Sequence, residues 1–321
     1  MESIYTFNKA VTTTNLWKQS KSAVSYRLDP QQFLGAHHLP ELPFAIYMML
    51  GMDFTGFHVR FRDISRGGVR LIKSNTNEGY VQNRRTQFQE NYNLAYTQKL
   101  KNKDIPESGS KGTILMKRGK NSMADHAFKQ YVDSLMDLIL REEGVCNNYD
   151  KPEIIFLGPD ENTAGVMDMA CEYSRDRNYD FWQSFTTGKS VKLGGVPHDA
   201  HGMTTRSVRA FVTGIMDRLN LNEEECTKVM TGGPDGDLGS NEILMSKEKI
   251  IGISDGSGCL YDPEGIDRDA LEKLAHDRDT VDKFDGHLSS KGFLLGVKEE
   301  NVTLPNGQVV GSGLQFRDSF H

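Results

Sequence analysis

Short stretches of apolar residues in the first half of the chain follow the spacings that are typical of strands. In residues 57–62, Phe or Val alternates with His or Arg, which predicts a half-buried strand. The paired glycines of residues 66–70 predict a turn after it. Beyond a loop predicted over 106–109, the apolar runs 113–116 and 153–157 predict two further strands, the second of them buried.

Three segments instead repeat apolar residues every three or four positions, the period of an amphipathic helix. Residues 78–103 and 122–142 carry this pattern, and Asn121 or Ser122 is suited to cap the second helix. Residues 208–219 carry the pattern most regularly. Because the predicted strands and helices alternate along the chain, the sequence predicts an α/β fold.

A second module begins near residue 200. An apolar strand is predicted at 228–231, a short helix at 240–248 and a second strand at 250–253, with a glycine-rich turn over 232–239 between the first two. This is a βαβ unit, but a doubly wound dinucleotide domain normally has two such halves. We therefore expect domains at 1–200 and 201–321, the second of them incomplete.

Composition narrows the class of protein. The 321 residues include 38 basic and 44 acidic side chains, a net charge of −6, which argues against both a disordered polyelectrolyte and a general nucleic-acid binder. The longest apolar stretch, 44–52, is far shorter than the ~20 residues that span a bilayer. The N-terminus does not resemble a secretory signal, and four widely spaced cysteines are typical of reduced thiols. A cytosolic enzyme without a membrane partner is the resulting expectation.

The glycine cluster 232–239 is a candidate phosphate-binding turn. Glycines let the backbone approach a pyrophosphate, and Asp255, 19 residues after Gly236, stands where an acid accepts a hydrogen bond from a ribose hydroxyl. The spacing departs from G-x-G-x-x-G, because two residues separate Gly233 from Gly236. A plain glycine-rich turn is the alternative interpretation.

Lys111 lies among small residues in the segment 105–113. The segment is not a nucleotide-triphosphate loop, because Ser110 precedes the lysine, Gly112 follows it and Pro106 occupies the position of the upstream glycine. A tight backbone pocket at a strand entrance would partly desolvate the ammonium group and lower its pKa. The alternative is a solvated loop lysine.

Other charged residues suggest a site for a dicarboxylate. Cations at Arg66, Arg70 and Lys99, together with Lys111, are suited to charge-assisted hydrogen bonds with carboxylates. Asp160 ends the strand predicted at 153–157, where α/β sheets keep their sites, although it is also placed to cap a helix over 163–173. His198 and His201 lack a nearby third ligand apart from Asp199, so we expect no metal site.

Four motifs taken in order closely resemble the large-subunit, NAD-specific glutamate dehydrogenases of fungi and protists. They are residues 57–70, 101–112, 158–163 and 197–208. The resemblance implies a substrate-binding α/β domain followed by an incomplete Rossmann-like dinucleotide-binding domain. Since it covers only part of that family's subunit, we expect this chain to be a fragment that is inactive alone.

The resemblance also implies roles for individual residues. Lys111 matches the family's catalytic lysine, which helps activate water, and Asp160 matches the acid that shuttles protons to and from the substrate amine. Lys99 matches the lysine that holds the α-carboxylate. Arg66, followed by Gly67, stands where smaller glutamate dehydrogenases have a lysine for the side-chain carboxylate.

The implied cofactor is NAD. The threonine that usually contacts the nicotinamide amide aligns ambiguously, with His201 or Thr204 as candidates. The remaining cofactor residues implied are Gly233, Gly236, Gly239 and Asp255.

The implied reaction is the reversible oxidative deamination of L-glutamate to 2-oxoglutarate and ammonium. A sister amino-acid dehydrogenase acting on branched or aromatic substrates is the nearest alternative, which Arg66 opposes because an apolar substrate would leave this cation unpaired. A non-catalytic binding or assembly fragment is the alternative from another class. We expect a homo-oligomer for the complete protein, in the cytosol, or in mitochondria if an upstream leader has been lost.

Overall fold

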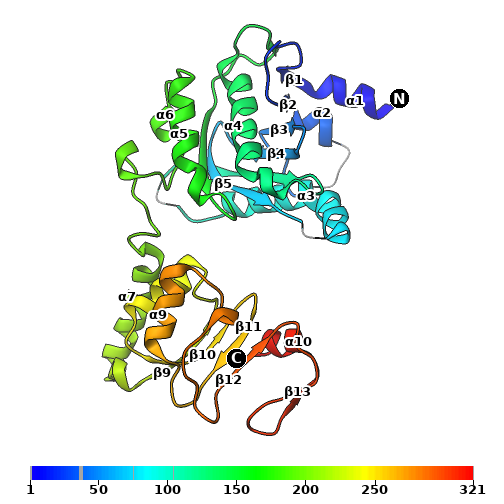
Figure 1. Ribbon diagram of the computed structural model, residues 1–321. Coiled ribbons are helices and arrows are strands. Elements are labelled where there is room, and N and C mark those ends of the chain that lie inside the picture. The colour runs from blue at the N-terminus through cyan, green and yellow to red at the C-terminus, as the bar shows by residue number, and fades with distance from the viewer. Residues whose placement is uncertain (1, 36–38, 75, 104, 321) are drawn as a thin grey trace. The chain divides into compact units, whose positions relative to one another are not determined.

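Eight strands form one mixed sheet in the first 197 residues of the computed structural model, which describes residues 2–35, 39–74, 76–103 and 105–320 (Figure 1). The strand order is β7-β1-β2-β3-β4-β6-β5-β8, and β5 pairs in parallel with both β6 and β8. The strands are β1 (Val11–Thr14), β2 (Val24–Leu28), β3 (Ala45–Leu50), β4 (Phe54–Arg60), β5 (Ile64–Ile72), β6 (Ser108–Met116), β7 (Cys146–Asn147) and β8 (Ile154–Pro159).

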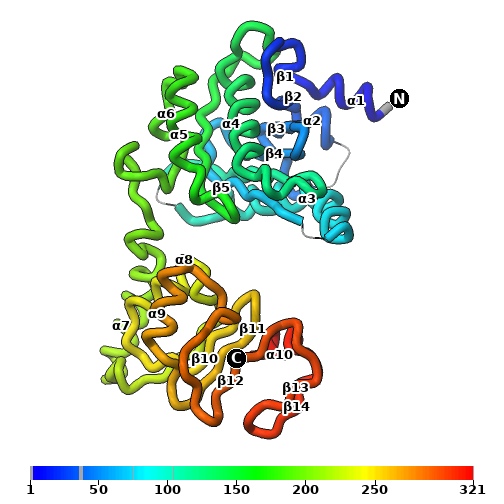
Figure 2. The backbone as a smooth tube through the Cα atoms, in the orientation of Figure 1, coloured from blue at the N-terminus to red at the C-terminus, as the bar shows by residue number. Residues whose placement is uncertain are grey.

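Helices cover both faces of this sheet, so the first unit has two hydrophobic cores. One core lies between the sheet and helices α4 and α5, which run side by side in Figure 2. The other core lies on the side of α1, α2 and α3. The helices are α1 (Glu2–Ala10), α2 (Pro30–Leu34), α3 (Asn77–Lys99), α4 (Ala124–Leu140), α5 (Met167–Asp176) and α6 (Trp182–Phe185).

The two cores explain why the predicted half-buried strand is wrong in one respect. Residues 54–60 do form a strand, but His58 and Arg60 are fully buried instead of facing solvent. Arg60 donates hydrogen bonds to the backbone carbonyls of Asp63 and Ile154, which partly satisfies its buried guanidinium group. Polar residues at alternate positions therefore did not mark an exposed face here.

The predicted turn at residues 66–70 is also wrong, since these residues are the middle of β5. The glycines serve close approach between strands, because a Cβ on Gly67 would lie 1.6 Å from the backbone oxygen of Ser110 in β6. Strand β6 starts earlier than predicted, so Gly109 lies in the strand rather than in a loop.

The helices predicted over 78–103 and 122–142 are confirmed as α3 and α4. Their caps differ from the prediction, because neither Asn121 nor Ser122 caps α4. Both lie in a 3₁₀ turn, Asn121–Met123, that precedes the helix, and the Asn121 side chain instead bonds the backbone oxygen of Ser74.

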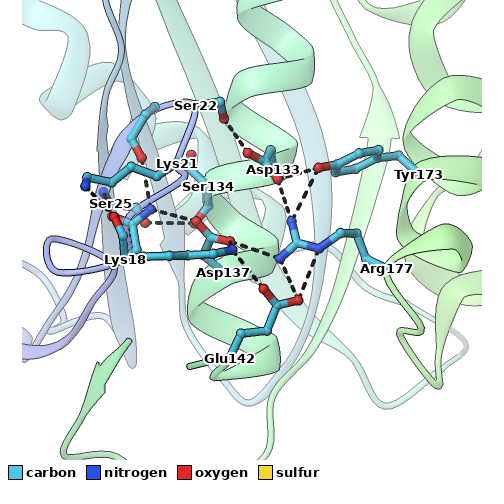
Figure 3. A network of polar contacts seen from close by, with 12 residues as sticks. Lys18, Lys21, Ser22, Ser25, Asp133, Ser134, Asp137, Glu142, Tyr173 and Arg177 are labelled. Carbon is cyan, nitrogen blue, oxygen red and sulfur yellow. Dashed lines mark hydrogen bonds and ion pairs between the residues drawn. The ribbon is translucent and has the colours of Figure 1, made fainter. Parts of the chain in front are cut away.

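A network of hydrogen bonds and ion pairs connects α4 to neighbouring elements of the first unit (Figure 3). Asp137 of α4 is fully buried and accepts hydrogen bonds from Asn15 Nδ2 at 2.8 Å and Arg177 Nη2 at 2.9 Å. Lys18 binds both Asp137 and Glu142. Burial opposes ionisation of Glu142, yet hydrogen bonds from Lys18 and Arg177 hold its pKa below the ordinary value. The network joins the loop after β1, helix α4 and the end of α5.

Residues 198–321 form the second unit, whose four-stranded sheet has the order β12-β11-β10-β9. The predicted βαβ unit is confirmed, since β9 and β10 are parallel and α8 connects them. Strands β11 and β12 continue the sheet antiparallel, and β13 and β14 form a separate hairpin. The elements are α7 (Met203–Leu219), β9 (Thr227–Thr231), α8 (Asp237–Met245), β10 (Lys249–Ser254), β11 (Gly258–Tyr261), α9 (Arg268–Asp277), β12 (Phe293–Gly296), β13 (Val302–Thr303), β14 (Val309–Val310) and α10 (Gly313–Asp318).

Helix α7 is present as predicted, but its apolar stripe is not buried. Phe211 is 76% exposed, and Ile215 and Leu219 are also exposed. Strand β9 has β10 as its neighbour and lies at the edge of the sheet. The most regular helical pattern of the sequence thus belongs to a helix that, among the described residues, buries only Thr205. No helix in the described part of the chain is both long enough and apolar enough to cross a membrane.

Candidate active site

Two adjacent parallel pairings in the first unit bring Lys111 and Asp160 together. Lys111 lies in β6, a strand whose residues are all buried, and Asp160 directly follows β8. Strand β5 lies between β6 and β8. The ammonium group of Lys111 forms an ion pair with the carboxylate of Asp160, and their side chains are 11% and 26% exposed.

Gly68 of β5 provides the space in which this ion pair forms. A Cβ at residue 68 would lie 2.9 Å from Cβ of Asp160 and 3.0 Å from its Oδ2. The neighbouring Gly67 is directed instead at the backbone of Ser110. The two glycines therefore have separate functions in the sheet: Gly67 permits strand packing and Gly68 leaves room for the carboxylate.

The predicted lowering of the pKa of Lys111 is confirmed. Burial is the largest cause, and with the nearby charges of Arg70 and Lys101 it lowers this pKa to about 8. Glu90 and Glu161 act in the opposite direction. The solvated-lysine interpretation is wrong, because Lys111 lies inside a strand. A lysine in this state is poised to exchange a proton near neutral pH.

Asp160 does not cap the helix that follows it. Its Oδ1 accepts a hydrogen bond from the amide of Glu161 at 2.8 Å, and its own amide donates to Thr163 Oγ1 at 2.9 Å. The helix predicted at 163–173 begins only at Met167, after a 3₁₀ turn without a side-chain cap. Asp160 is thus free to interact with Lys111.

Arg66 and Lys99 belong to elements that pack on β6, the strand of Lys111. Arg66 of β5 is paired in register with Gly109 of β6, and a Cβ on Gly109 would lie 2.1 Å from the backbone nitrogen of Lys99. Lys111 follows Gly109 by two residues and so points to the same face of β6. Arg66, Lys99 and Lys111, three of the four predicted cations, thus lie on elements that pack together around β6.

Each of the three cations has an internal carboxylate partner. Arg66 Nε lies 2.9 Å from Glu107 Oε1, and Lys99 pairs with Glu41. Arg66 would therefore not be left unpaired by an apolar substrate, and that argument against a sister dehydrogenase does not hold. Sequence reasoning missed both glutamates. Glu107 stands inside the quoted 101–112 motif, whereas nothing local marked Glu41.

Arg70, the fourth of the predicted cations, also has carboxylate partners. Its guanidinium group binds Glu90 of α3 at 2.6 Å and lies 3.3 Å from Glu161, the neighbour of Asp160. This arrangement fixes a positive charge near Lys111, which is consistent with its effect on the pKa of that lysine.

In the second unit, Gly233 and Gly239 allow tight packing of the backbone in the predicted phosphate-binding turn. A Cβ on Gly239 would lie 2.1 Å from the backbone oxygen of Gly233, and one on Gly233 would lie 2.4 Å from Oδ2 of Asp255. Gly236 is different, because the nearest atom to its Cβ would be 3.8 Å away. The turn leads into the N-terminus of α8, the end of a helix that favours anions.

Asp255 lies beside this turn, at the end of β10, and already binds its own chain. Its Oδ1 accepts hydrogen bonds from Ser257 N and Oγ and from Gly258 N, and its Oδ2 accepts one from Val281 N at 2.7 Å. Oδ2 retains one acceptor position, since a carboxylate oxygen can accept two hydrogen bonds. The turn and this remaining position fit a dinucleotide, although the acid also has a structural role.

His201 and Thr204 are both exposed at the start of α7. The segment containing them packs on α8, where Thr205 Oγ1 donates to the backbone oxygen of Leu238 and Asn241 binds Asp199. They therefore lie near the helix that follows the glycine turn. Within the described ranges, no three His, Cys, Asp or Glu side chains are grouped as a metal ion would require.

Comparison with known proteins relates both units to one kind of enzyme. Residues 194–310 match the Glutamate/Leucine/Phenylalanine/Valine dehydrogenase family. Glutamate dehydrogenase 2 of Dictyostelium discoideum is 52% identical over 319 residues, which are 99% of this chain and 30% of that protein. The NAD-specific glutamate dehydrogenase of Saccharomyces cerevisiae is 46% identical, over 100% of this chain and 30% of that protein.

The chain thus spans about 30% of the length of these relatives. A similar fold occurs in the crystal structure of the hetero-hexameric glutamate dehydrogenase from Thermus thermophilus, in its leucine-bound form. The TM-score is 0.50 at 23% identity, over 74% of this chain and 53% of that one, which is a likeness of fold alone.

Proposed function

Because this chain is related over its whole length to the NAD-specific glutamate dehydrogenases of fungi and protists, we propose that it carries the catalytic part of an NAD-dependent glutamate dehydrogenase. The reaction is the reversible conversion of L-glutamate to 2-oxoglutarate and ammonium. The observation that supports this proposal best is the ion pair between Lys111 and Asp160, with Arg66 on the strand that lies between them.

In the proposed reaction, the two members of the ion pair move protons at different atoms. Asp160 accepts a proton from the substrate amine as hydride leaves Cα, which produces an iminium group. The uncharged amine of Lys111 then takes a proton from the water that attacks the iminium carbon. Asp160 returns its proton to the nitrogen, and its carboxylate then takes the hydroxyl proton as the C–N bond breaks, the carbonyl forms and ammonia leaves.

Bound NAD supplies the acceptor for the hydride. The residues that would hold it are Gly233, Gly239 and the N-terminus of α8 for the pyrophosphate, and Oδ2 of Asp255 for a ribose hydroxyl. Gly236, His201 and Thr204 complete the proposed cofactor site. Of the two candidates for the contact with the nicotinamide amide, neither is preferred.

The substrate is proposed to be a dicarboxylic amino acid because Arg66 and Lys99 lie on β5 and α3, the elements that pack on the strand of Lys111. Lys99 would bind the α-carboxylate, and Arg66, next to Gly67, would bind the side-chain carboxylate through charge-assisted hydrogen bonds. A substrate with an apolar side chain would gain nothing from Arg66.

The test is glutamate-dependent formation of NADH by the full-length product of the gene that encodes this chain, with norvaline and leucine as competing substrates. The proposal expects kcat/KM for glutamate to exceed that for norvaline by about 10- to 10²-fold, since the side-chain carboxylate contributes a charged hydrogen bond of ~1.5–3 kcal/mol. Turnover of leucine in preference to glutamate would contradict it.

We also propose that the full-length product is a homo-oligomer located in the cytosol, with mitochondria as the alternative. Light scattering coupled to gel filtration gives the mass of the particle, and fractionation of the source cells gives the compartment. A monomer in solution would contradict the first proposal, and recovery only from sealed mitochondria would contradict the second.

A further inference from the structure

Glu107 is a buried carboxylate shared by two cations at the edge of the candidate active site. Its Oε1 lies 2.9 Å from Arg66 Nε and 3.4 Å from Lys103 Nζ. The side chain of Glu107 is 6% exposed, whereas that of Arg66 is 40% exposed. Glu107 therefore contacts Arg66 from the protein side, and the guanidinium group lies between the carboxylate and solvent.

Lys103, the second cation beside Glu107, is anchored to β6. Lys103 Nζ donates a hydrogen bond to the backbone oxygen of Ser108 at 3.1 Å, and Ser108 is the first residue of β6. Glu107 directly precedes this strand, and Arg66 lies in the adjacent strand β5. Both partners of the ion pair are thus attached to the sheet.

The contact uses the inner nitrogen of the guanidinium group. Among the described residues, the two terminal nitrogens of Arg66 are not the atoms closest to Glu107, and they make no hydrogen bond. A carboxylate is bound best by two parallel N–H groups of an arginine, and a guanidinium group that is already oriented loses less rotamer entropy on binding.

We propose that Glu107 is a positioning residue that orients Arg66, so that the terminal nitrogens of Arg66 bind the side-chain carboxylate of a dicarboxylate substrate. This inference rests on the proposed function for the identity of the substrate. It adds a residue that acts through Arg66 and does not touch the substrate itself.

The direct test is binding of glutarate and pentanoate to the full-length gene product, measured by calorimetry. The two probes have chains of the same length, but only glutarate has a second carboxylate. Glu107→Gln keeps the shape of the side chain and removes its charge, so we expect glutarate to bind about five- to tenfold more weakly and pentanoate to bind as before. Glu107→Asp, which keeps the charge, should recover part of the affinity.

Lys103→Met is the matched control, because it removes the other partner of Glu107 and leaves Arg66 in place. We expect it to leave glutarate binding within about twofold of the unaltered protein. Equal weakening of both probes by Glu107→Gln would indicate a general structural role and overturn the proposal. Tighter binding of glutarate would also overturn it, because Glu107 would then compete with the ligand.

Kinetics separate this inference from the proposed function. Glu107→Gln should raise KM for glutamate with kcat changed less, and should have no further effect when combined with Arg66→Leu. Additive effects of Glu107→Gln and Arg66→Leu would contradict the positioning role. If the unaltered protein forms no NADH from glutamate but glutarate binding still depends on Glu107, the proposed function fails and the positioning role stands.

Discussion

The backbone of Gly68 faces the carboxyl group of Asp160 so closely that a Cβ at residue 68 would lie 3.0 Å from Oδ2 of that carboxylate. Few real Cβ contacts are that short, so a side chain at this position must displace Asp160 from Lys111. The ion pair of the candidate site therefore depends on a residue that contributes no functional group.

Gly68→Ala should lower kcat by about tenfold or more, because a displacement of ~1 Å in an active site can cost ~10²-fold. Gly67→Ala is the comparison, since its Cβ would lie 1.6 Å from the Ser110 backbone and should chiefly destabilise the fold. Melting temperature and turnover of both variants are the measurements. A fully active Gly68→Ala protein would contradict the proposed geometry.

Removal of either member of the ion pair tests its chemistry. Lys111→Met and Asp160→Asn should each reduce kcat by at least ~10²-fold, the usual scale for a lost acid–base group. The melting temperature should change little, because the Asp160 side chain is 26% exposed and Lys111, with a pKa of about 8, is already close to losing its charge. If activity and melting temperature fall together, the pair is structural instead.

The pH dependence of the reaction should report the low pKa of Lys111. The uncharged amine is the active form, so kcat/KM for glutamate should rise with pH up to a plateau above about 8. Arg70→Gln removes a positive charge that lowers this pKa, so the rise should move to higher pH. A pH profile that Arg70→Gln leaves unchanged, or moves to lower pH, would argue against Lys111 as the titrating group.

Cofactor choice should depend on Asp255. The 2′-phosphate of NADP would bring ~1.5–2 negative charges against its carboxylate, and like charges ~4 Å apart repel by ~4 kcal/mol at an effective dielectric of ~20. No Lys or Arg occurs at 254–260 to compensate. We expect NAD to be preferred by at least ~10²-fold in kcat/KM.

Asp255→Asn is the matching substitution, because it keeps an acceptor oxygen for the local bonds to Ser257 and Gly258 while removing the charge. It should improve the use of NADP more than it impairs the use of NAD. A loss of melting temperature with an unchanged cofactor ratio would leave Asp255 with only its structural role.

The network around Asp137 should dominate the stability of the first unit. Asp137→Ala would leave Lys18 and Arg177 without their buried partner, and breaking a buried ion pair in this way costs ~3–5 kcal/mol. Asp176→Ala is the control, because its ion pair with Arg175 is exposed. Urea unfolding compares the two, and similar midpoints for both variants would contradict the prediction.

Local periodicity predicted most of the helices and strands that lie near the site, because each of them has one dominant apolar face. It failed where tertiary contacts decide the outcome. Arg60 is buried although it occupies one of the polar positions that alternate with apolar ones in residues 57–62. The paired glycines of β5 resemble a turn in the sequence, and only their contact with the neighbouring strand explains them. Strands β1, β2 and β3 gave no clear signal, since they are short and their residues are mixed.

The candidate site was predictable only in part, for a similar reason. Lys111 stood out through its small neighbours at the entrance of a predicted strand, and Asp160 through its place at the end of another. Glu41 and Glu107 did not, because an internal counter-ion is recognised by proximity in space, and Glu41 is 58 residues away from its partner Lys99. For helix α7 the sequence predicted the helix correctly from its apolar stripe, but such a stripe does not indicate which part of a protein packs against it.

Strand order also sets when the Lys111–Asp160 pair can form during folding. Lys111 lies in β6, between two partner strands, whereas Asp160 follows β8, an edge strand that pairs with β5. Parallel pairing closes a long loop and is slow compared with local contacts, so β8 is expected to dock after β4, β5 and β6 have associated. Detachment of this single edge strand would then abolish the acid–base pair while most of the sheet, and Lys111 with it, stayed folded.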